Sequence, residues 1–496
     1  MSEQVDVAIV GSGFSGLGMA IQLKREGRDD FVVLERADAV GGTWWANTYP
    51  GCACDVPSHL YSFSFAPNPE WTETYSRQPE IRDYLIQCSR KFGVHPHIRF
   101  GNELTDAHWD ADAQRWQIET TGGSYDARVL VLAAGALFEP KIPDFAGIDS
   151  FQGEKWHSAR WNHDYDLNGK RVVSVGTGAS AIQLVPAIQP EVDQLYVVQR
   201  TPPWVFPHTG RETTRFERRL YKRFPALQKL VRGLVYAQRE TFVLGFVKNP
   251  KIMKIAEKIA RAHMRKELGE RQDLVDKVTP DYTIGCKRIL PSNKWYGALA
   301  QDNVELVTSP IKEIKPNGFV TEDGADHEVD ALIFSTGFQV TEMPSSNLVR
   351  DADGRTLREA WDGSPQAHKG TTIHGFPNLF LMLGPNTGLG HSSMVYMVES
   401  QINYVLAALR EMDERGAAAV DVRPDAEERY NEDLHQKLEG TVWNTGCASW
   451  YVDVHGRNVT LWPDWTFRFR RQTANFDTGS YDLLPVRAPE RDEVAA

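Results

Sequence analysis

Two glycine-rich turns carry the clearest chemistry in this sequence. They follow the pattern Gly-x-Gly-x-x-Gly/Ala, with Gly11, Gly13 and Gly16 in the first and Gly176, Gly178 and Ala181 in the second. In such a turn the first glycine permits a tight bend, the second lets a diphosphate approach the backbone, and the third lets strand and helix pack closely. The diphosphate then lies at a helix N-terminus, where unpaired N–H groups and the helix dipole favour negative charge. Each turn is therefore predicted to bind a dinucleotide.

The residue that ends the next predicted strand differs between the two turns. Glu35 lies 19 residues after Gly16, and Arg200 lies 19 residues after Ala181. A carboxylate accepts hydrogen bonds from ribose hydroxyls and repels a 2′-phosphate, whereas an arginine pairs with that phosphate. We therefore predict that FAD binds the first turn and NADPH the second. The alternative is that Arg200 is an ordinary solvated surface charge.

The segments around these turns predict the elements that position them. Apolar, β-branched runs at 5–10, 31–35, 170–175 and 195–199 are typical of strands buried on both faces, and helical patterns follow each turn at 17–26 and 181–188. Two further predicted strands, 128–135 and 330–338, each break at a glycine. They suggest that the chain passes at these two points from one domain to the other.

The predicted architecture is α/β, with two Rossmann-like dinucleotide-binding domains. The NADPH-binding domain, 144–332, is inserted into a discontinuous FAD-binding domain made of 1–143 and 333–496. It includes a helical insertion at about 208–285.

The middle of the chain is unusually basic. Between Arg211 and Glu267, the stretches 218–224 and 252–267 predict amphipathic helices rich in Lys and Arg. One interpretation is a surface for membranes or for delivery of hydrophobic substrates. The other is a solvated helical insertion whose long basic side chains lie along its own surface.

Composition limits the remaining possibilities. The 496 residues carry a net charge of −11, which gives no general reason to bind nucleic acid. No apolar run approaches the roughly 18 residues of a transmembrane helix, and no signal sequence is evident. Five cysteines, an odd and sparse set, argue against a disulfide framework, so a reducing cytoplasm is expected. No grouping of His, Cys and Asp has metal-ligand spacing, so no metal site is predicted.

Two longer patterns resemble fingerprints of the Baeyer–Villiger monooxygenases, and the resemblance extends over essentially the whole chain. The first runs from Gly41-Gly42-Thr43-Trp44 to Asp55, and the second comprises Phe151-Gln152-Gly153, His157 and Trp161. Related flavin N- and S-oxygenases carry a shorter second pattern with Tyr or Phe at the last position, so Trp161 favours the Baeyer–Villiger branch. Asn162 departs from the Pro or Asp usual there.

The resemblance implies a reaction and a set of site residues. Reduction of FAD by NADPH, addition of O2 at flavin C4a and attack of the resulting peroxyflavin on a ketone would give an ester or lactone, or a sulfoxide if a sulfide enters. The implied catalytic residues are Arg288 and its orienting partner Asp55. The implied flavin contacts are Thr43, Trp44, Asp55, Tyr61 and Met394, and those for NADPH are Ala181, Arg200, Thr201, Lys287 and Trp450. Without the resemblance, Lys287-Arg288 reads as an exposed basic pair.

Two other functions and one residue remain open at this point. Cys52 and Cys54 follow the FAD motif near where flavin disulfide reductases place a redox pair, although one intervening residue is too few for a relaxed disulfide. A non-catalytic nucleotide-binding or sensor protein is a further alternative. His157 lies between Trp156 and Trp161 and is expected to be a packed structural residue rather than a catalytic one.

Overall fold

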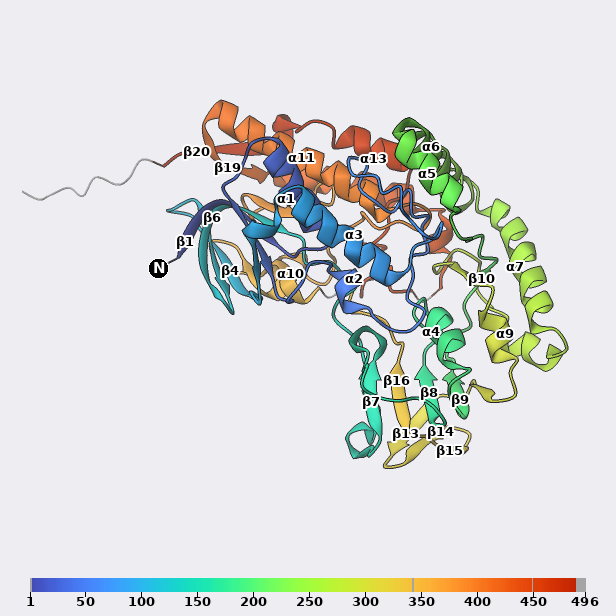
Figure 1. Cartoon of the computed structure of the whole chain (residues 1–496). Coiled ribbons are helices and arrows are strands. Elements are labelled where there is room, and N and C mark those ends of the chain that lie inside the picture. Colours follow the sequence, from blue (N-terminus) through green and yellow to red (C-terminus); the bar gives the residue numbers. More distant parts are fainter. Residues whose placement is uncertain (1, 341–342, 448, 488–496) are drawn as a thin grey trace, which may run out of the picture.

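The computed structural model describes residues 2–340, 343–447 and 449–487. The predicted second part of the FAD-binding domain includes 341–342, 448 and 488–496, which lie outside the described residues. The chain forms a larger α/β body and, below it in Figure 1, a smaller one with its own sheet. Helices cover the larger body and extend along one side of the molecule.

The first sheet is built around the predicted FAD-binding turn. Strand β1 (Glu3–Val10) lies in parallel between β2 (Phe31–Glu35) and β6 (Gly123–Leu132), and the turn leads from β1 into α1 (Phe14–Arg25). Strand β18 (Leu379–Leu381) pairs in parallel with β6. Because β18 comes from the last third of the chain, this fold is discontinuous in sequence, as predicted.

Strands that the sequence analysis did not predict extend this sheet. Strands β4 (Leu104–Asp110) and β5 (Arg115–Thr120) continue it from β6 in antiparallel fashion, and β17 (Val349–Arg350) pairs with β4. On the other edge, β3 (Ile98–Phe100) pairs with β2.

The second sheet contains the other glycine turn. Its strand order is β12-β9-β8-β16-β7, all parallel, and the turn joins β8 to α4 (Ala181–Ile188). The strands are β7 (Glu154–His157), β8 (Arg171–Val175), β9 (Gln194–Val198), β12 (Val304–Val307) and β16 (Ala331–Phe334). A three-stranded antiparallel sheet, β13 (Ile311–Lys315), β14 (Gly318–Thr321) and β15 (Asp326–Glu328), lies below it in Figure 1.

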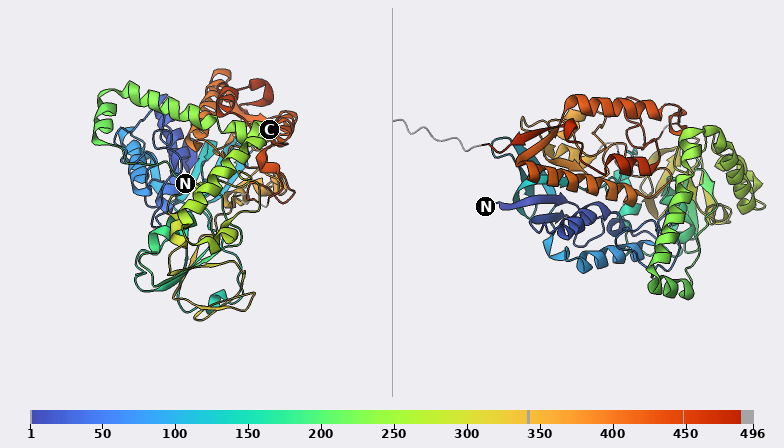
Figure 2. Two further views of the ribbon diagram at one scale, coloured as in Figure 1. Left: turned by 90° about the vertical axis from the view of Figure 1, so that its right-hand side faces the viewer. Right: turned by 90° about the horizontal axis from the view of Figure 1, so that it is seen from above.

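The helical insertion leaves and rejoins the body through two short paired strands. These are β10 (Val205–Phe206) and β11 (Leu290–Pro291), which form a parallel pair. Between them lie α5 (Arg215–Arg223), α6 (Pro225–Glu240), α7 (Met253–Leu268) and α8 (Val275–Val278). The sequence analysis predicted helices over most of α5 and α7 but did not identify α6. The left view of Figure 2 faces this group of helices.

The remaining elements complete the body around the first sheet. They are α2 (Thr43–Ala46), α3 (Gln78–Lys91), α9 (Trp295–Leu299), α10 (Leu357–Trp361), α11 (Met394–Arg415), β19 (Ala417–Val422), α12 (Pro424–Leu438), α13 (Thr466–Gln472) and β20 (Tyr481–Pro485). Helix α11 packs against α1, and β19 pairs with β20. Across the described part of the chain, no helix is both long and apolar enough to span a bilayer.

Candidate functional site

The first glycine turn can be built only with glycine at two of its three motif positions. Gly11 has φ +101°, and a Cβ added there would lie 2.6 Å from the carbonyl oxygen of Ala133. A Cβ on Gly16 would lie 1.9 Å from the carbonyl oxygen of Gly11. The turn therefore keeps the backbone open at the N-terminus of α1, as a diphosphate cradle requires.

Glu35 lies against this turn. Its side chain is buried and accepts hydrogen bonds from the Ser12 N–H and hydroxyl, at 2.8 and 2.6 Å, and from the Ala37 N–H at 2.8 Å. The carboxylate thus lies at the end of β2 beside the cradle, where a nucleotide ribose would meet it.

The second turn has the same geometry. Gly176 has φ +107°, and a Cβ there would lie 2.6 Å from the carbonyl oxygen of Ser335. A Cβ on Gly178 would meet nothing within 4 Å, so this position faces open space in front of α4. The Thr177 hydroxyl donates to the carbonyl oxygen of Thr201 at 2.9 Å, which ties the turn to the segment after β9.

Two cations lie near this second turn. Arg200 is exposed, and neither it nor Lys287 forms an ion pair with a described carboxylate. Burial, and then the positive charge of Arg200, lower the pKa of Lys287, whose Nζ lies 4.8 Å from the centre of the Tyr282 ring. Two neighbouring cations without a paired carboxylate are well suited to a phosphate group.

Arg288 and Asp55 form an ion pair that joins two segments far apart in the sequence. Arg288 donates from Nε to Oδ2 of Asp55 at 2.9 Å, and from Nη2 to Oδ1 and Oδ2 at 2.7 Å each. Asp55 ends the first fingerprint, and Arg288 lies two residues before the start of β11. The structure thus brings together the two residues that the family resemblance implied as partners.

The pair is held in its charged form. Burial opposes ionisation of Asp55, but the charge and hydrogen bonds of Arg288 outweigh it, so the pKa of Asp55 lies below its ordinary value. The charge of Asp55 in turn raises the pKa of Arg288. Burial raises the pKa of the neighbouring Tyr451 to about 12, so that this phenol is neutral.

The orientation of Arg288 leaves part of its guanidinium available. Nε and Nη2 are used by Asp55, whereas Nη1 donates no hydrogen bond to the described residues, and the side chain is 36% exposed. One edge of the cation is therefore fixed, while the other can face an anion.

Two of the residues expected to contact the flavin, Trp44 and Tyr61, lie beside the first turn. Trp44, in α2, donates from Nε1 to the Tyr61 hydroxyl at 3.2 Å, and the two rings form an edge-to-face pair. Tyr61 also packs against Phe14 of the turn, with ring centroids 5.0 Å apart. Thr43 begins α2 and Met394 begins α11. The buried Ser392 hydroxyl just before α11 has no hydrogen-bond partner, as expected for a segment that faces a polar group absent from the protein itself.

Trp450 is the remaining residue expected to contact NADPH, and it lies in the segment that follows α12. Its side chain is 46% exposed and packs edge-to-face on Tyr451, with ring centroids 4.5 Å apart. It makes no ring or cation–π contact with Arg200, Thr201 or Lys287 in the part of the chain that the structure describes.

Gln183 of α4 makes contacts near the site that the sequence analysis did not predict. Its Oε1 accepts from the Tyr49 hydroxyl at 2.9 Å and the Ala53 N–H at 3.3 Å, and its Nε2 donates to the Ala53 carbonyl at 3.0 Å. A Cβ on Gly51 would lie 2.6 Å from the Gln183 carbonyl oxygen. The fingerprint loop that carries Asp55 is thereby fixed directly onto the helix of the second turn.

His157 has the packed setting that was expected. The side chain is buried, and its Nδ1 accepts a hydrogen bond from the Ala159 N–H at 3.1 Å. Burial lowers its pKa to about 4, so the imidazole is neutral near pH 7. The ring caps a short turn and contacts Phe338.

The structure agrees with the expectation for Cys52 and Cys54 but differs from it for Cys286 and Cys447. Cys52 and Cys54 are free, and burial raises the pKa of both thiols, to about 12 for Cys52, so they lack the features of a redox pair. Cys286 and Cys447, however, form a disulfide. The expectation of a fully reduced protein is thus wrong for this pair, because folding brings together two cysteines that lie 161 positions apart.

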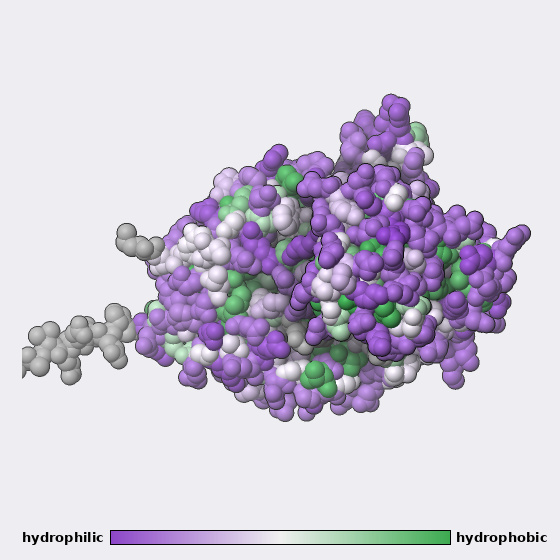
Figure 3. Space-filling model, turned by 90° about the horizontal axis from the view of Figure 1, so that it is seen from below, coloured by the Kyte–Doolittle hydropathy of each residue, from purple (hydrophilic) through white to green (hydrophobic). Residues whose placement is uncertain are grey.

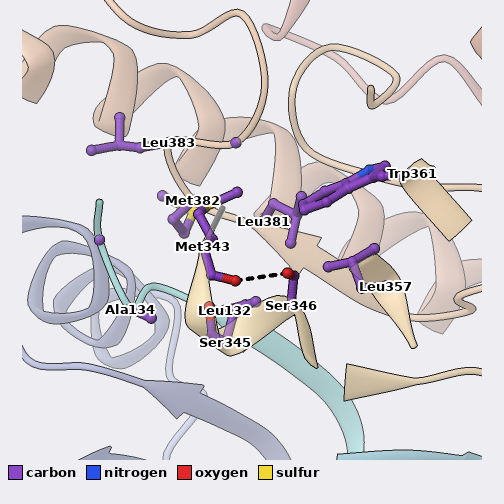
Figure 4. A pocket seen from close by; sticks show the side chains of 12 residues that line it. Leu132, Ala134, Met343, Ser345, Ser346, Leu357, Trp361, Leu381, Met382 and Leu383 are labelled. Atoms are coloured by element: carbon purple, nitrogen blue, oxygen red, sulfur yellow. Dashed lines mark hydrogen bonds between the residues drawn. The ribbon is translucent and has the colours of Figure 1, made fainter. Parts of the chain in front are cut away.

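An enclosed pocket lies at the carboxyl ends of β6 and β18 (Figure 4). It is lined mainly by apolar side chains, among them Leu132, Met343, Trp361 and Leu381. Its volume of about 20 Å³ corresponds to about one water molecule. It is therefore too small to be a substrate site.

The structure thus contains two glycine turns of the dinucleotide-binding type and an ion pair between Asp55 and Arg288. This combination defines a class of flavoproteins with two dinucleotide-binding domains. Residues 4–346 match the family model described as flavin-binding monooxygenase-like. The chain belongs to this family and, within it, to the Baeyer–Villiger monooxygenases.

Two curated relatives carry that name. A Baeyer–Villiger monooxygenase of Streptomyces coelicolor is 52% identical and aligns with 97% of this chain and 93% of its own length. One of Pseudomonas aeruginosa is 50% identical, over 96% of this chain and 91% of its own length.

Solved structures agree with this relationship. A closed structure of cyclohexanone monooxygenase has a TM-score of 0.87 at 26% identity, and covers 98% of this chain and all of its own. An oxidised steroid monooxygenase bound to NADP has a TM-score of 0.86 at 30% identity, with the same coverage. These findings confirm the predicted family and fold class.

Proposed function

We propose that this protein is an FAD- and NADPH-dependent monooxygenase that inserts one oxygen atom of O2 into a ketone. The products are an ester or lactone, NADP⁺ and water, and the second oxygen atom leaves in the water. The relatives named Baeyer–Villiger monooxygenase support this assignment over a disulfide reductase, as do the unpaired thiols of Cys52 and Cys54. A sulfide that enters the same site would give a sulfoxide. The reaction takes place in the cytoplasm, where NADPH is supplied.

The residues present fit both cofactors. FAD is held by the first turn, Glu35, Thr43, Trp44, Asp55, Tyr61 and the N-terminus of α11 at Met394, and NADPH by the second turn, Arg200, Thr201, Lys287 and Trp450. The support is the two glycine cradles, the buried carboxylate beside the first and the unpaired cations beside the second. The domain boundaries at residues 143 and 332 are part of this proposal. Residue 143 falls between β6 and β7, whereas residue 332 lies within β16 (Ala331–Phe334) of the second sheet, so we place the second boundary just after Phe334.

When bound, FAD accepts a hydride from NADPH and reacts with O2. The protein supplies binding, orientation and charge. Arg288 stabilises negative charge that develops on oxygen during insertion, because arginine stays protonated when it is shielded from water. Asp55 acts through Arg288 as a positioning residue. It holds the Nε and Nη2 edge and leaves Nη1 to face the reacting oxygen.

The observation that carries the proposal is the Arg288–Asp55 pair, and Arg288→Ala tests it. The variant should bind FAD and consume NADPH in air but release the oxygen as hydrogen peroxide, with ester formation reduced at least a hundredfold. The assay combines NADPH oxidation, peroxide detection and gas chromatography of a ketone reaction. Arg265→Ala, an exposed arginine on α7, is the matched control.

If Arg288→Ala forms ester at nearly the wild-type rate, Arg288 is not required for oxygen insertion. Asp55→Ala should slow both NADPH consumption and ester formation, since it releases the arginine. Asp55→Asn should retain more of both, because its amide oxygen can still accept from Nε.

A further inference from the structure

Exposed apolar side chains are concentrated in the helical insertion. The described residues include fifteen large hydrophobic side chains with substantial exposure, and nine of them lie between 216 and 259. They are Phe216, Phe224, Leu230, Leu234, Phe242, Leu244, Ile252, Ile255 and Ile259. Clusters of this kind on a monomer mark an interaction surface rather than chance exposure.

Helix α6 exposes two leucines on the face that points away from the core. Its inner face combines polar and apolar side chains: Arg232 donates to the backbone carbonyls of His59 and Ser62, and Glu240 accepts from Thr466. Val235 and Tyr236 on this face pack against the core. Its outer face instead presents Leu230 and Leu234, which are 58% and 63% exposed.

Helix α7 and the short helical turn Pro250–Ile252 that precedes it present an apolar ridge bordered by positive charge. Ile252, Ile255 and Ile259 are spaced three and four residues apart, so they lie on one face. Each follows a lysine, and Lys251, Lys254 and Lys258 are exposed without an ion pair to a described carboxylate. Met253, Ala260 and Met264 on the opposite face are buried.

The charge of this segment is opposite to that of the whole protein. Residues 211–267 contain sixteen Lys and Arg against five Asp and Glu, whereas the complete chain has a net charge of −11. Helices α5, α6 and α7 lie together along one side of the molecule (Figures 1 and 2). In the view from below, the surface is largely hydrophilic, and hydrophobic atoms reach it near the right-hand edge, the side on which α7 lies in Figure 1 (Figure 3).

We propose that the outer faces of α6 and α7 form a docking surface for a bilayer rich in anionic phospholipids. The lysines contact the headgroups, and the isoleucines and leucines enter the boundary between headgroups and acyl chains, with the helices in the plane of the interface. The protein lies on the membrane reversibly and does not cross it. The combination of apolar ridge and unpaired lysines selects this occupant, since an apolar partner surface alone would not require the charge.

Vesicle sedimentation of the full-length, FAD-loaded protein tests the proposal. Binding is expected to vesicles of phosphatidylcholine with phosphatidylglycerol, to weaken as salt is raised, and to be at least tenfold weaker to phosphatidylcholine alone. The double variant Ile255→Ser/Ile259→Ser and the triple variant Lys251→Glu/Lys254→Glu/Lys258→Glu should each lower partitioning at least tenfold.

Matched controls separate this surface from general effects. Val486→Ser replaces an exposed hydrophobic residue elsewhere, and Lys91→Glu/Lys312→Glu/Lys437→Glu makes the same charge change on other elements. Both should bind as the wild type does. All variants should keep the wild-type melting temperature and rate of NADPH oxidation, because none of these residues touches the proposed site.

Three results would overturn the proposal. The wild type could fail to sediment with anionic vesicles, the α7 variants could bind as strongly as the wild type, or the controls could lose binding equally. Self-association without vesicles that the α7 variants abolish would instead identify a second copy of the chain as the occupant. Monooxygenase activity is not needed for any of these measurements, so their outcome is independent of the proposed reaction.

Discussion

Arg200 illustrates how a single side chain can decide between two coenzymes. It is exposed, has no ion-pair partner among the described residues and lies near Lys287. Replacement by Ala should weaken NADPH binding by about 1.5–3 kcal/mol, or roughly tenfold or more, and leave NADH binding almost unchanged. Steady-state kinetics with both coenzymes measure this, with Arg215→Ala as the control. Equal losses for both coenzymes would show that Arg200 does not recognise the 2′-phosphate.

Individual site residues could be predicted from the sequence where their role depends on residue type and on spacing along the chain. The glycine turns and the Glu35–Arg200 contrast follow from spacing alone, and the Arg288–Asp55 pair follows from family resemblance. Gln183 carries no such signal, because its importance arises only when α4 meets the fingerprint loop.

At the scale of elements, the contact between α4 and the fingerprint loop should govern how the two cradles are aligned. Gln183→Ala removes three hydrogen bonds that cross this contact. We expect a loss of about 1–3 kcal/mol in stability and a lower rate of flavin reduction by NADPH, with NADPH affinity changed less. Thermal unfolding and stopped-flow reduction measure the two effects, and Gln301→Ala, at a distant site, is the control. An unchanged reduction rate would show that the contact does not align the cofactors.

The Cys286–Cys447 disulfide links the segment of Arg288 to the segment of Trp450. Thiol titration of the unfolded, unreduced protein should therefore give three free thiols rather than five. Cys447→Ser should lower the free energy of unfolding by about 2–4 kcal/mol and raise the KM for NADPH, because both connected segments are then less restrained. Cys88→Ser, which removes a free buried thiol, controls for the loss of a sulfur atom. Five titratable thiols in the wild type would contradict the link.

Elements were predictable where their pattern is regular. The strands and helices of both glycine-turn units appear within a few residues of their predicted positions, since buried parallel strands are continuous apolar runs. Helix α6 was missed although its sequence is amphipathic, because the analysis of the basic segment singled out only the stretches 218–224 and 252–267. The disulfide was missed because cysteines 161 positions apart have no local signature.

At the scale of the whole molecule, stability should depend on pH through the body around the first sheet. Glu427 of α12 accepts the His374 N–H at 2.7 Å, and burial raises its pKa to about 7. The folded protein therefore holds this proton more tightly than the unfolded chain, whose glutamates titrate near 4.3. The contribution of this group to the free energy of unfolding is therefore greatest below about pH 4.3, and it is lost as the pH rises towards 7.

Glu427→Gln should flatten that dependence. The wild-type melting temperature is expected to fall by a few degrees between pH 5 and pH 8 because of this group, and the variant should lose about 1–2 kcal/mol of the pH-linked change. Differential scanning calorimetry at several pH values measures it, with the exposed Glu428→Gln as the control. If the melting temperature of the variant depends on pH as steeply as that of the wild type, the proton is bound by another group.

The first and last strands of the second sheet are neighbours, with β7 and β16 in parallel register. The chain also crosses into and out of this body side by side, where the Lys141 N–H donates to the Gly337 carbonyl at 2.9 Å and the Gln339 N–H to the Glu139 carbonyl at 3.0 Å. A gene segment that encodes the inserted body would thus begin and end at one place on the host fold. Such a segment can be exchanged between relatives as one unit, because only the two adjacent chain crossings connect it to the host fold. The coenzyme preference would then be transferred with the segment.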